Sequence, residues 1–509
     1  MKLLGRDPAT YVSPFVRSRR ELAAATALCA LLTGCAVGPD FKKPAPPEVS
    51  GYTAGPLTTT SATGNTTGGE AQTFDQGKDV AADWWTLFHS EPLNDLIRQA
   101  LANSPDLKAA QAALKAAREN VLAQRGAYLP SVSAGFSANR YLQPGTLAPV
   151  PSNNAFEYNL FTPEVSVSYA PDVFGLNRRT VESLEAQQQA TRFQMIATYN
   201  TLVSNVVVTA IQEAATQAQI DFTRQLIDAN TKMVDILQYQ LAKGYASGVD
   251  LAAQKSQLAD AIATLPPLQK QAAQLHDQLA FLIGQFPSQA QDPKFDLASL
   301  QLPQDLPVSL PSKLVEQRPD VRQAEANLHA ASAAIGIAVA NRLPNIQLTA
   351  NAGSSALAMS QLFTPGTGFW AIGAAVTQPI FEGGQLLHAE RAARDNYEQA
   401  AQQYRSTVLA AFQNVADTLT ALQQDADALK AAAVANDAAK TTLDLAERQV
   451  KDGYSAPLAL LNAEQAYQQA QINLIQAQAN RYADTAALFQ ALGGGWWNAP
   501  DLGKNANAK

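Results

Sequence analysis

Hydrophobic and polar residues alternate one by one in four short stretches of this chain. In residues 131–141, for example, Val132 and Phe136 belong to one side of the alternation, and Ser133 and Ser137 belong to the other. Successive side chains of a β-strand face opposite sides of a sheet, so each stretch predicts a strand with one apolar and one polar face. A strand of about ten residues is also long enough to cross a bilayer at a tilt. The predicted strands are residues 131–141, 161–170, 345–353 and 369–377.

Two very long stretches have an apolar stripe that repeats about every seven residues, and they contain neither proline nor glycine. They are residues 179–243 and 385–451. At a rise of 1.5 Å per residue, each predicts a helix about 100 Å long, which needs coiled-coil neighbours along its length. A glycine-containing reversal and a return helix follow each of them. In the first return helix, Pro266 and Pro267 predict a kink or an interruption.

This plan of helix, strand pair and long helical hairpin occurs twice. Pro105 is matched by Pro319 at a shift of 214 positions, and Pro130 is matched by Pro344 at the same shift. Shared landmarks at a constant shift are hard to obtain by chance, so they predict an internal duplication. The four strands of one chain cannot close a barrel, because transmembrane barrels start at about eight strands. Closure therefore requires other chains, and a trimer would supply twelve strands.

The N-terminal residues predict export and lipid attachment. Arginines, a short apolar run and small residues precede Cys35, which is the layout of a signal peptide ending at residue 34. The sequence Leu32-Thr33-Gly34-Cys35 predicts acylation of Cys35, and the alternative is ordinary secretory cleavage near a cysteine. The only other cysteine, Cys29, lies inside the signal peptide, so the mature chain has no cysteine pair for a disulfide.

Proline- and glycine-rich stretches divide the chain into six predicted segments. They are a lipoprotein signal peptide (1–34), an acylated tether or strap (35–82), a first repeat (83–286) with its hairpin tip at 244–250, a Pro-rich linker (287–311), a second repeat (312–497) with its tip at 452–458, and a disordered tail (498–509).

Charge and residue spacing exclude several classes of function. The formal net charge is −7, and removal of the basic signal peptide leaves about −10, which argues against nucleic-acid binding. Gly493–Gly495 is typical of a helix stop rather than a phosphate loop. We find no run of about twenty apolar residues, no nucleophile motif and no metal-ligand spacing, so we predict no enzyme activity, cofactor or metal site. The scattered histidines are His89, His276, His329 and His388.

Motifs spread over nearly the whole mature chain carry a family resemblance. The most specific are Cys35 followed by Val37-Gly38-Pro39 and the terminal Leu492-Gly493-Gly494-Gly495-Trp496. With them the chain resembles the TolC-like outer-membrane efflux protein family, in its lipoprotein (NodT-type) branch. The resemblance implies an α+β membrane protein, in which a homotrimer forms a 12-stranded transmembrane β-barrel that a long α-helical coiled-coil tunnel continues into the periplasm.

The resemblance also implies the function and the partners. The protein would be the outer-membrane exit duct of a tripartite efflux pump. It would pass drugs or other small molecules from an inner-membrane RND-type pump, through a periplasmic adaptor protein, to the cell exterior. Outer-membrane lipid would surround the barrel. The chain would be a passive conduit that is gated at the periplasmic helix tips.

Two sets of residues receive roles from the resemblance alone. The family carries an aspartate ring and an arginine at the second tip, and the matching positions here are Asn462 and Gln465, so a strong acidic ring is in doubt. Asp452 and Asp250 could supply acid nearby, although Asp250 also fits a helix cap. The adaptor-docking residues would be Gly244, Tyr245, Gly248, Gly453, Tyr454 and Pro457.

Two other functions remain open from the sequence. The same architecture could serve as the outer-membrane duct of a type I protein secretion system. A lipid-anchored periplasmic coiled-coil scaffold without a pore is the third hypothesis, and the alternating strands argue against it.

Overall fold

The computed structural model describes residues 36–55, 57–144, 156–290, 295–452, 454–455 and 457–503. The predicted signal peptide, Cys35 and Gly453 lie outside these residues. The chain divides into two compact units, which are described separately below. Unit 1 combines the residues up to Lys42 with Ala116–Gln188 and Ala326–Ala401, and unit 2 combines Lys43–Lys115, Gln189–Glu325 and Gln402–Lys509.

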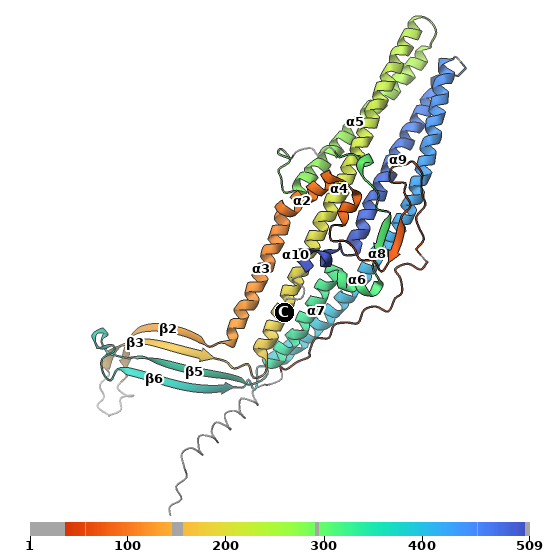
Figure 1. Cartoon of the computed structure of the whole chain (residues 1–509). Helices are drawn as coiled ribbons and strands as arrows, with labels where there is room; N and C mark the ends of the chain where they lie inside the picture. Colours follow the sequence, from red (N-terminus) through yellow and green to blue (C-terminus); the bar gives the residue numbers. More distant parts are fainter. Residues whose placement is uncertain are drawn as a thin grey trace, which may run out of the picture. The chain divides into compact units, whose positions relative to one another are not determined.

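Unit 1 contains one antiparallel sheet of four strands, in the order β2-β3-β5-β6 (Figure 1). Each half of the duplication supplies one hairpin, because Val132 faces Val167 across β2 and β3, and Ile346 faces Val376 across β5 and β6. The first hairpin is longer than the alternation predicts, since residues 156–160 continue its ladder. The strands are β2 (Ser131–Gln143), β3 (Phe156–Tyr169), β5 (Asn345–Ser354) and β6 (Gly368–Thr377).

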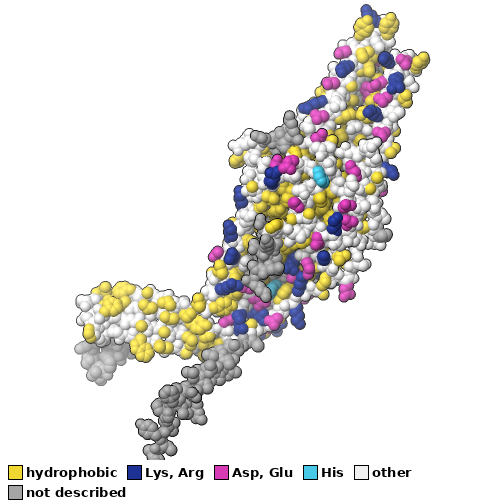
Figure 2. All heavy atoms as spheres, in the orientation of Figure 1, with side chains coloured by type: hydrophobic (Ala, Val, Ile, Leu, Met, Phe, Trp, Pro, Cys, Tyr) yellow, Lys and Arg dark blue, Asp and Glu magenta, His cyan; other side chains and the backbone are white. Residues whose placement is uncertain are grey.

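The two faces of this sheet differ in chemistry. Large apolar side chains are exposed along it, whereas the opposite positions carry small polar side chains such as Ser133 and Ser166, whose hydroxyls lie 2.9 Å apart. Figure 2 shows hydrophobic and uncharged side chains over the strands on the face in view. Within the described residues, β2 and β6 are the outer strands, and each has one neighbour only. The exposed apolar residues include Val132, Phe136, Val165, Trp370, Ile372 and Val376.

Two helices of 67 residues dominate the chain, α4 (Leu176–Ala242) and α8 (Gln385–Lys451). Gly384, in the left-handed region with φ +91°, ends the preceding turn and α8 begins directly after it. None of the helices among the described residues has the length and hydrophobicity of a membrane span. The shorter helices are α2 (Glu91–Asn103), α3 (Pro105–Arg125), α5 (Gly248–Leu282), α6 (Pro311–Gln317), α7 (Pro319–Ala340), α9 (Pro457–Ala491) and α10 (Pro500–Gly503).

Of the two outcomes predicted for the first return helix, a kink or an interruption, the interruption is wrong. Pro266 and Pro267 lie inside α5, which continues through them to Leu282. Proline leaves the carbonyl of an earlier turn without its amide donor. Both prolines are exposed, so water can bind the carbonyl groups that they leave unpaired.

An aromatic cluster forms part of the core of unit 2. The ring of Trp84 is buried and stacks on Phe489 with centroids 5.0 Å apart, and Phe88 and Tyr482 pack beside them. The indole of Trp496 donates a 2.6 Å hydrogen bond to the carbonyl of Gln317. Trp84 and Trp496 are therefore packing anchors, since Trp84 joins residues 84–88 to α9 and Trp496 joins the residues after α9 to the end of α6.

The described residues between 43 and 82 form a strap along unit 2. Strand β1 (Thr73–Gln76) pairs in parallel with β4 (Asp305–Val308), which lies in the predicted Pro-rich linker. The fully buried Arg481 holds the strap from α9, since its Nη2 donates to the hydroxyl of Thr60 at 3.0 Å and to the carbonyl of Glu70 at 2.7 Å.

The expectation of disorder throughout residues 498–509 is wrong for its first part. Residues Pro500–Gly503 form the short helix α10, and the guanidinium of Arg192 donates a 2.7 Å hydrogen bond to the carbonyl of Leu502. Asn498 also donates to the carbonyl of Val80 at 2.8 Å. These tertiary contacts order a segment whose own sequence has little helix propensity. Residues 504–509 lie outside the described part of the chain.

Candidate functional site

The first hairpin tip is a tight turn between α4 and α5. Gly244 has a φ of +78°, which ends α4, and the amide of Tyr245 donates to the carbonyl of Gln240 at 2.8 Å. Ser247 caps α5 by accepting from the amide of Asp250, whose carboxylate accepts in return from the amide of Ser247. The Asp250 carboxylate is therefore used in a capping box. Tyr245 is 82% exposed and Gly248 has open space around it.

The second tip repeats the first at the end of α8. The amide of Tyr454 donates to the carbonyl of Gln449 at 2.8 Å, as Tyr245 does to Gln240, and its side chain is 87% exposed. Asp452 is exposed and donates its amide to the carbonyl of Arg448 at 2.9 Å. Pro457 begins α9. Each tip thus presents one exposed tyrosine on a short and well-bonded turn.

The structure does not bring the four predicted gate residues together within the protomer. Asp250 lies in the first turn of α5 and Asp452 in the turn after α8, whereas Asn462 and Gln465 lie on α9 and are exposed. Gln465 is the one whose side chain reaches a neighbouring helix, because its Nε2 donates to Oε1 of the buried Gln257 at 2.8 Å.

A buried polar layer beside these positions joins three helices. The amide of Gln254 on α5 donates to Oδ1 of Asn230 on α4 at 2.5 Å, and Gln254 also hydrogen-bonds Glu464 on α9. Asn230, Gln254 and Glu464 are all buried, and Oε2 of Glu464 finds no hydrogen-bond partner among the described residues. Burial raises the pKa of Glu464 to about 6; the Gln254 hydrogen bond lowers it, and the negative charge of Glu447 on α8 raises it further.

Sequence reasoning missed Glu464, although it lies between the predicted gate residues Asn462 and Gln465. Its helix stripe contains Leu460 and Ala463, which are buried, and a charged residue beside such a stripe is normally assigned to the solvated face. The sequence signal that could have revealed Glu464 is a pair of polar residues, Asn230 on α4 and Gln254 on α5. Both occupy positions for which the coiled-coil pattern predicts apolar residues.

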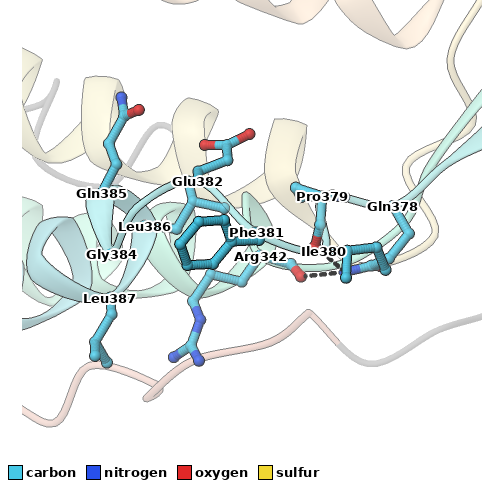
Figure 3. Close-up of a pocket in the computed structure, with 10 residues that line it drawn as sticks. All are labelled: Arg342, Gln378, Pro379, Ile380, Phe381, Glu382, Gly384, Gln385, Leu386 and Leu387. Atoms are coloured by element: carbon cyan, nitrogen blue, oxygen red, sulfur yellow. Dashed lines mark hydrogen bonds between the residues drawn. The ribbon is translucent and has the colours of Figure 1, made fainter.

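A hollow of about 370 Å³ lies at the turn from β6 to α8 in unit 1 (Figure 3). Glu382 and Gln385 point to one side of this turn, and Arg342 and Leu387 point to the other. Ile380 is exposed and contributes no polar group. The hollow therefore lacks the convergent polar groups of a ligand site. The described residues also contain no group of three acidic, histidine or cysteine side chains that could hold a metal ion.

The chain matches the family model described as "Outer membrane efflux protein" over residues 96–285 and 310–494. The two matched ranges correspond to the two halves of the duplication.

Among curated proteins, the chain is 30% identical over 475 residues to the probable efflux pump outer membrane protein TtgC of Pseudomonas putida, covering 92% of this chain and 94% of the relative. The antibiotic efflux pump outer membrane protein ArpC of Pseudomonas putida matches with the same identity and coverage. The outer membrane protein OprJ of Pseudomonas aeruginosa is 27% identical over 92% of this chain and 95% of its own length.

Solved outer-membrane channels share the fold. The Campylobacter jejuni CmeC channel superposes with a TM-score of 0.81 at 20% identity, over 93% of this chain and 98% of that one. The open state of the Neisseria gonorrhoeae MtrE channel superposes with a TM-score of 0.76 at 25% identity, over 91% of this chain and 98% of that one.

Proposed function

The chain belongs to the outer membrane efflux protein family, and on this premise we propose how it builds the exit duct of a tripartite pump. The protein is an outer-membrane efflux channel, not an enzyme. The observation that carries the mechanism is the four-stranded sheet with two free edges and one exposed apolar face.

Three protomers close the barrel in this proposal. Lipid tolerates no open sheet edge, so β2 and β6 each need a partner in the membrane. Antiparallel pairing of β6 with β2 of the next copy satisfies both edges and gives twelve strands. The apolar positions, such as Trp370 and Ile372, then face lipid, and the serine-rich positions face a water-filled lumen.

The same pairing gives a role to the turn of Figure 3. The end of β6 meets the start of β2 of the neighbouring copy, which brings the exposed Ile380 and Phe381 to the exposed Leu129 of that copy. Burial of these side chains would favour the trimer over a free protomer.

The helical hairpins supply the wall and the gate. Each 67-residue helix is about 100 Å long, which suits a duct that crosses the periplasm. We place the gate at Asp452, Asn462, Gln465 and Asp250, and we place adaptor docking at the exposed tyrosine tips. A periplasmic adaptor and an inner-membrane RND-type pump complete the system. Small-molecule cargo is favoured over secreted protein, because ArpC is named as an antibiotic efflux pump protein and another relative that is 30% identical, TtgC of a second Pseudomonas putida strain, is named as a toluene efflux pump protein.

Acylation of Cys35 adds a lipid anchor in this proposal. Cys35 would be the first residue of the mature chain. The tether or strap, the two repeats, the linker and the tail would follow it, with the boundaries predicted from the sequence. Two acyl signals hold a protein stably at a membrane surface. Labelling with palmitate, with Cys35→Ala as the control, tests this part separately.

Reconstitution of the purified protein tests the duct. We expect a trimer by light scattering and single-channel conductance in planar bilayers. The control is Ile372→Arg, which places a charge on the predicted lipid face and should prevent insertion. A monomer that gives no conductance under any gating condition would overturn the barrel and leave a periplasmic scaffold.

A further inference from the structure

Residues 36–41, hereafter the N-terminal segment, are bound in a site that neither the barrel nor the gate uses. Arg179 of α4 is at its centre, with a side chain that is 5% exposed. Its Nε donates to the carbonyl of Val37 at 3.0 Å, and its Nη2 donates to the carbonyl of Gly38 at 3.3 Å and to the carboxylate of Asp40 at 2.7 Å. The guanidinium thus binds mainly the backbone of the segment.

Three glycines make room for this backbone. Gly38 has a φ of +92°, and a Cβ there would lie 2.4 Å from the Cα of Gly336 on α7. A Cβ on Gly336 would in turn lie 2.9 Å from the carbonyl oxygen of Val37. A Cβ on Gly175 would lie 2.6 Å from the Cα of Ala36. The site therefore accepts a closely approaching chain and no side chain at these points.

Side chains from two helices complete the site. Glu182 on α4 accepts from Nη1 of Arg179 at 2.7 Å, and its other oxygen lies 2.9 Å from Nε2 of His329 on α7. The His329 ring stacks on Phe41 with centroids 4.3 Å apart and an angle of 12°. Burial alone would lower the pKa of Arg179, but its hydrogen bonds to Asp40 and Glu182 raise it above the ordinary value.

The position of the site along the chain indicates its use. Gly175 belongs to the turn between β3, which ends at Tyr169, and α4, which begins at Leu176. Ala36 touches that turn, and Ala36 is the residue that follows Cys35. A free segment of six residues would let an acylated Cys35 range over about 20 Å, whereas a segment bound from Ala36 onward leaves one residue of freedom.

We propose that Gly175, Arg179, Glu182, His329 and Gly336 form a clasp that fixes the acylated N-terminus beside the periplasmic rim of the barrel. The proposal rests on the proposed barrel and on the proposed acylation of Cys35. Fixing the anchor there directs the acyl chains into the bilayer next to the strands of the same protomer. Arg179 is a positioning residue in this account.

Lys42 is exposed and adjoins the clasp. The rate of tryptic cleavage after Lys42, in the protein extracted from outer membranes, therefore measures how firmly the clasp holds the N-terminal segment. We expect Arg179→Ala to speed this cleavage at least tenfold. Arg178→Ala, at the neighbouring half-buried position whose side chain pairs, among the described residues, with Asp172 and not with the N-terminal segment, is the matched control and should leave the rate unchanged. Gly38→Ala is an independent variant, because it alters only the bound segment, and it should also speed cleavage.

Palmitate incorporation is measured on the same samples. The proposal predicts equal labelling of wild type and Arg179→Ala, with faster cleavage in the variant only. Equal cleavage rates in wild type, Arg179→Ala and Gly38→Ala, all of them labelled, would overturn the clasp and leave acylation standing. If the wild type is not labelled with palmitate but Lys42 is still protected from trypsin, the acyl anchor is overturned, and with it the role of the clasp in fixing that anchor.

Discussion

Replacing Glu464 by glutamine should strengthen the pairing of α5 and α9 at pH 7.5 and strengthen it much less at pH 5. Burial raises the pKa of this carboxyl to about 6 in the folded protein, against an ordinary value of 4.5. The folded state therefore binds the proton more tightly than the unfolded state does. The stability that this proton supplies is complete below about pH 4.5 and is lost as the pH rises through 6.

The magnitude follows from the difference in pKa. One unit corresponds to about 1.4 kcal/mol, so a rise of roughly 1.5 units costs the ionised carboxylate about 2 kcal/mol above pH 7. Because Glu464 is buried, solvent screening reduces this cost little. Glutamine keeps the shape and the hydrogen bond to Gln254 without the charge, and the variant should therefore lose the pH dependence.

Native-state hydrogen exchange of the amides of 460–470 measures this effect, after correction for intrinsic rates. Between pH 5 and pH 7.5, protection in the wild type should fall about eightfold relative to Glu464→Gln, because at pH 5 part of the full effect of about 2 kcal/mol has already been lost. Asp444→Asn removes an exposed acid from the same hairpin and is the control. Identical pH profiles for wild type and Glu464→Gln would refute the reasoning.

Four further outcomes can be checked. Trp84→Ala removes a buried stacked ring and should cost about 3–5 kcal/mol, seen as a lower urea midpoint for unit 2. Ser247→Ala should cost about 1 kcal/mol and speed amide exchange at the first tip only. Burial, a hydrogen bond to Asp484 and the charge of Asp484 raise the pKa of Asp425 to about 7. The wild type should therefore lose stability in thermal melts as the pH rises through 7, and Asp425→Asn should remove this loss. Ile372→Arg should cost about 2–4 kcal/mol and deplete outer-membrane trimers, whereas Ala371→Arg on the opposite face should be tolerated in the same fractionation.

Local sequence signals were sufficient for the long elements. Helix α8 has the bounds that the absence of proline and glycine predicts, because Gly384 ends the preceding turn and the second tip reverses the chain after Lys451. The hairpin register also follows from the alternation, since a shift by one residue would exchange the two faces of the sheet.

Sequence reasoning failed where a residue's role depends on a partner far along the chain. Glu464 is buried beside Gln254, which in turn bonds Asn230, and the spacing along α9 does not contain that information. The role of Arg179 was missed for the same reason, because the N-terminal segment that it binds precedes it by about 140 residues. The motif after Cys35 was visible as a family signature, but only the fold shows that its glycine meets Gly336.

The strap has a consequence for the order in which the protein can form. Arg481 bonds Thr60 across 421 residues, and Asn498 bonds Val80 across 418. Loop-closure entropy grows only with the logarithm of length, so such contacts cost little more than shorter ones once both ends are present. They cannot form, however, until nearly the whole chain has been exported. A chain truncated before Arg481 can still pair β1 with β4, but it lacks the bonds that hold Thr60, Glu70 and Val80, so the strap is fully fastened only when the C-terminal residues are present.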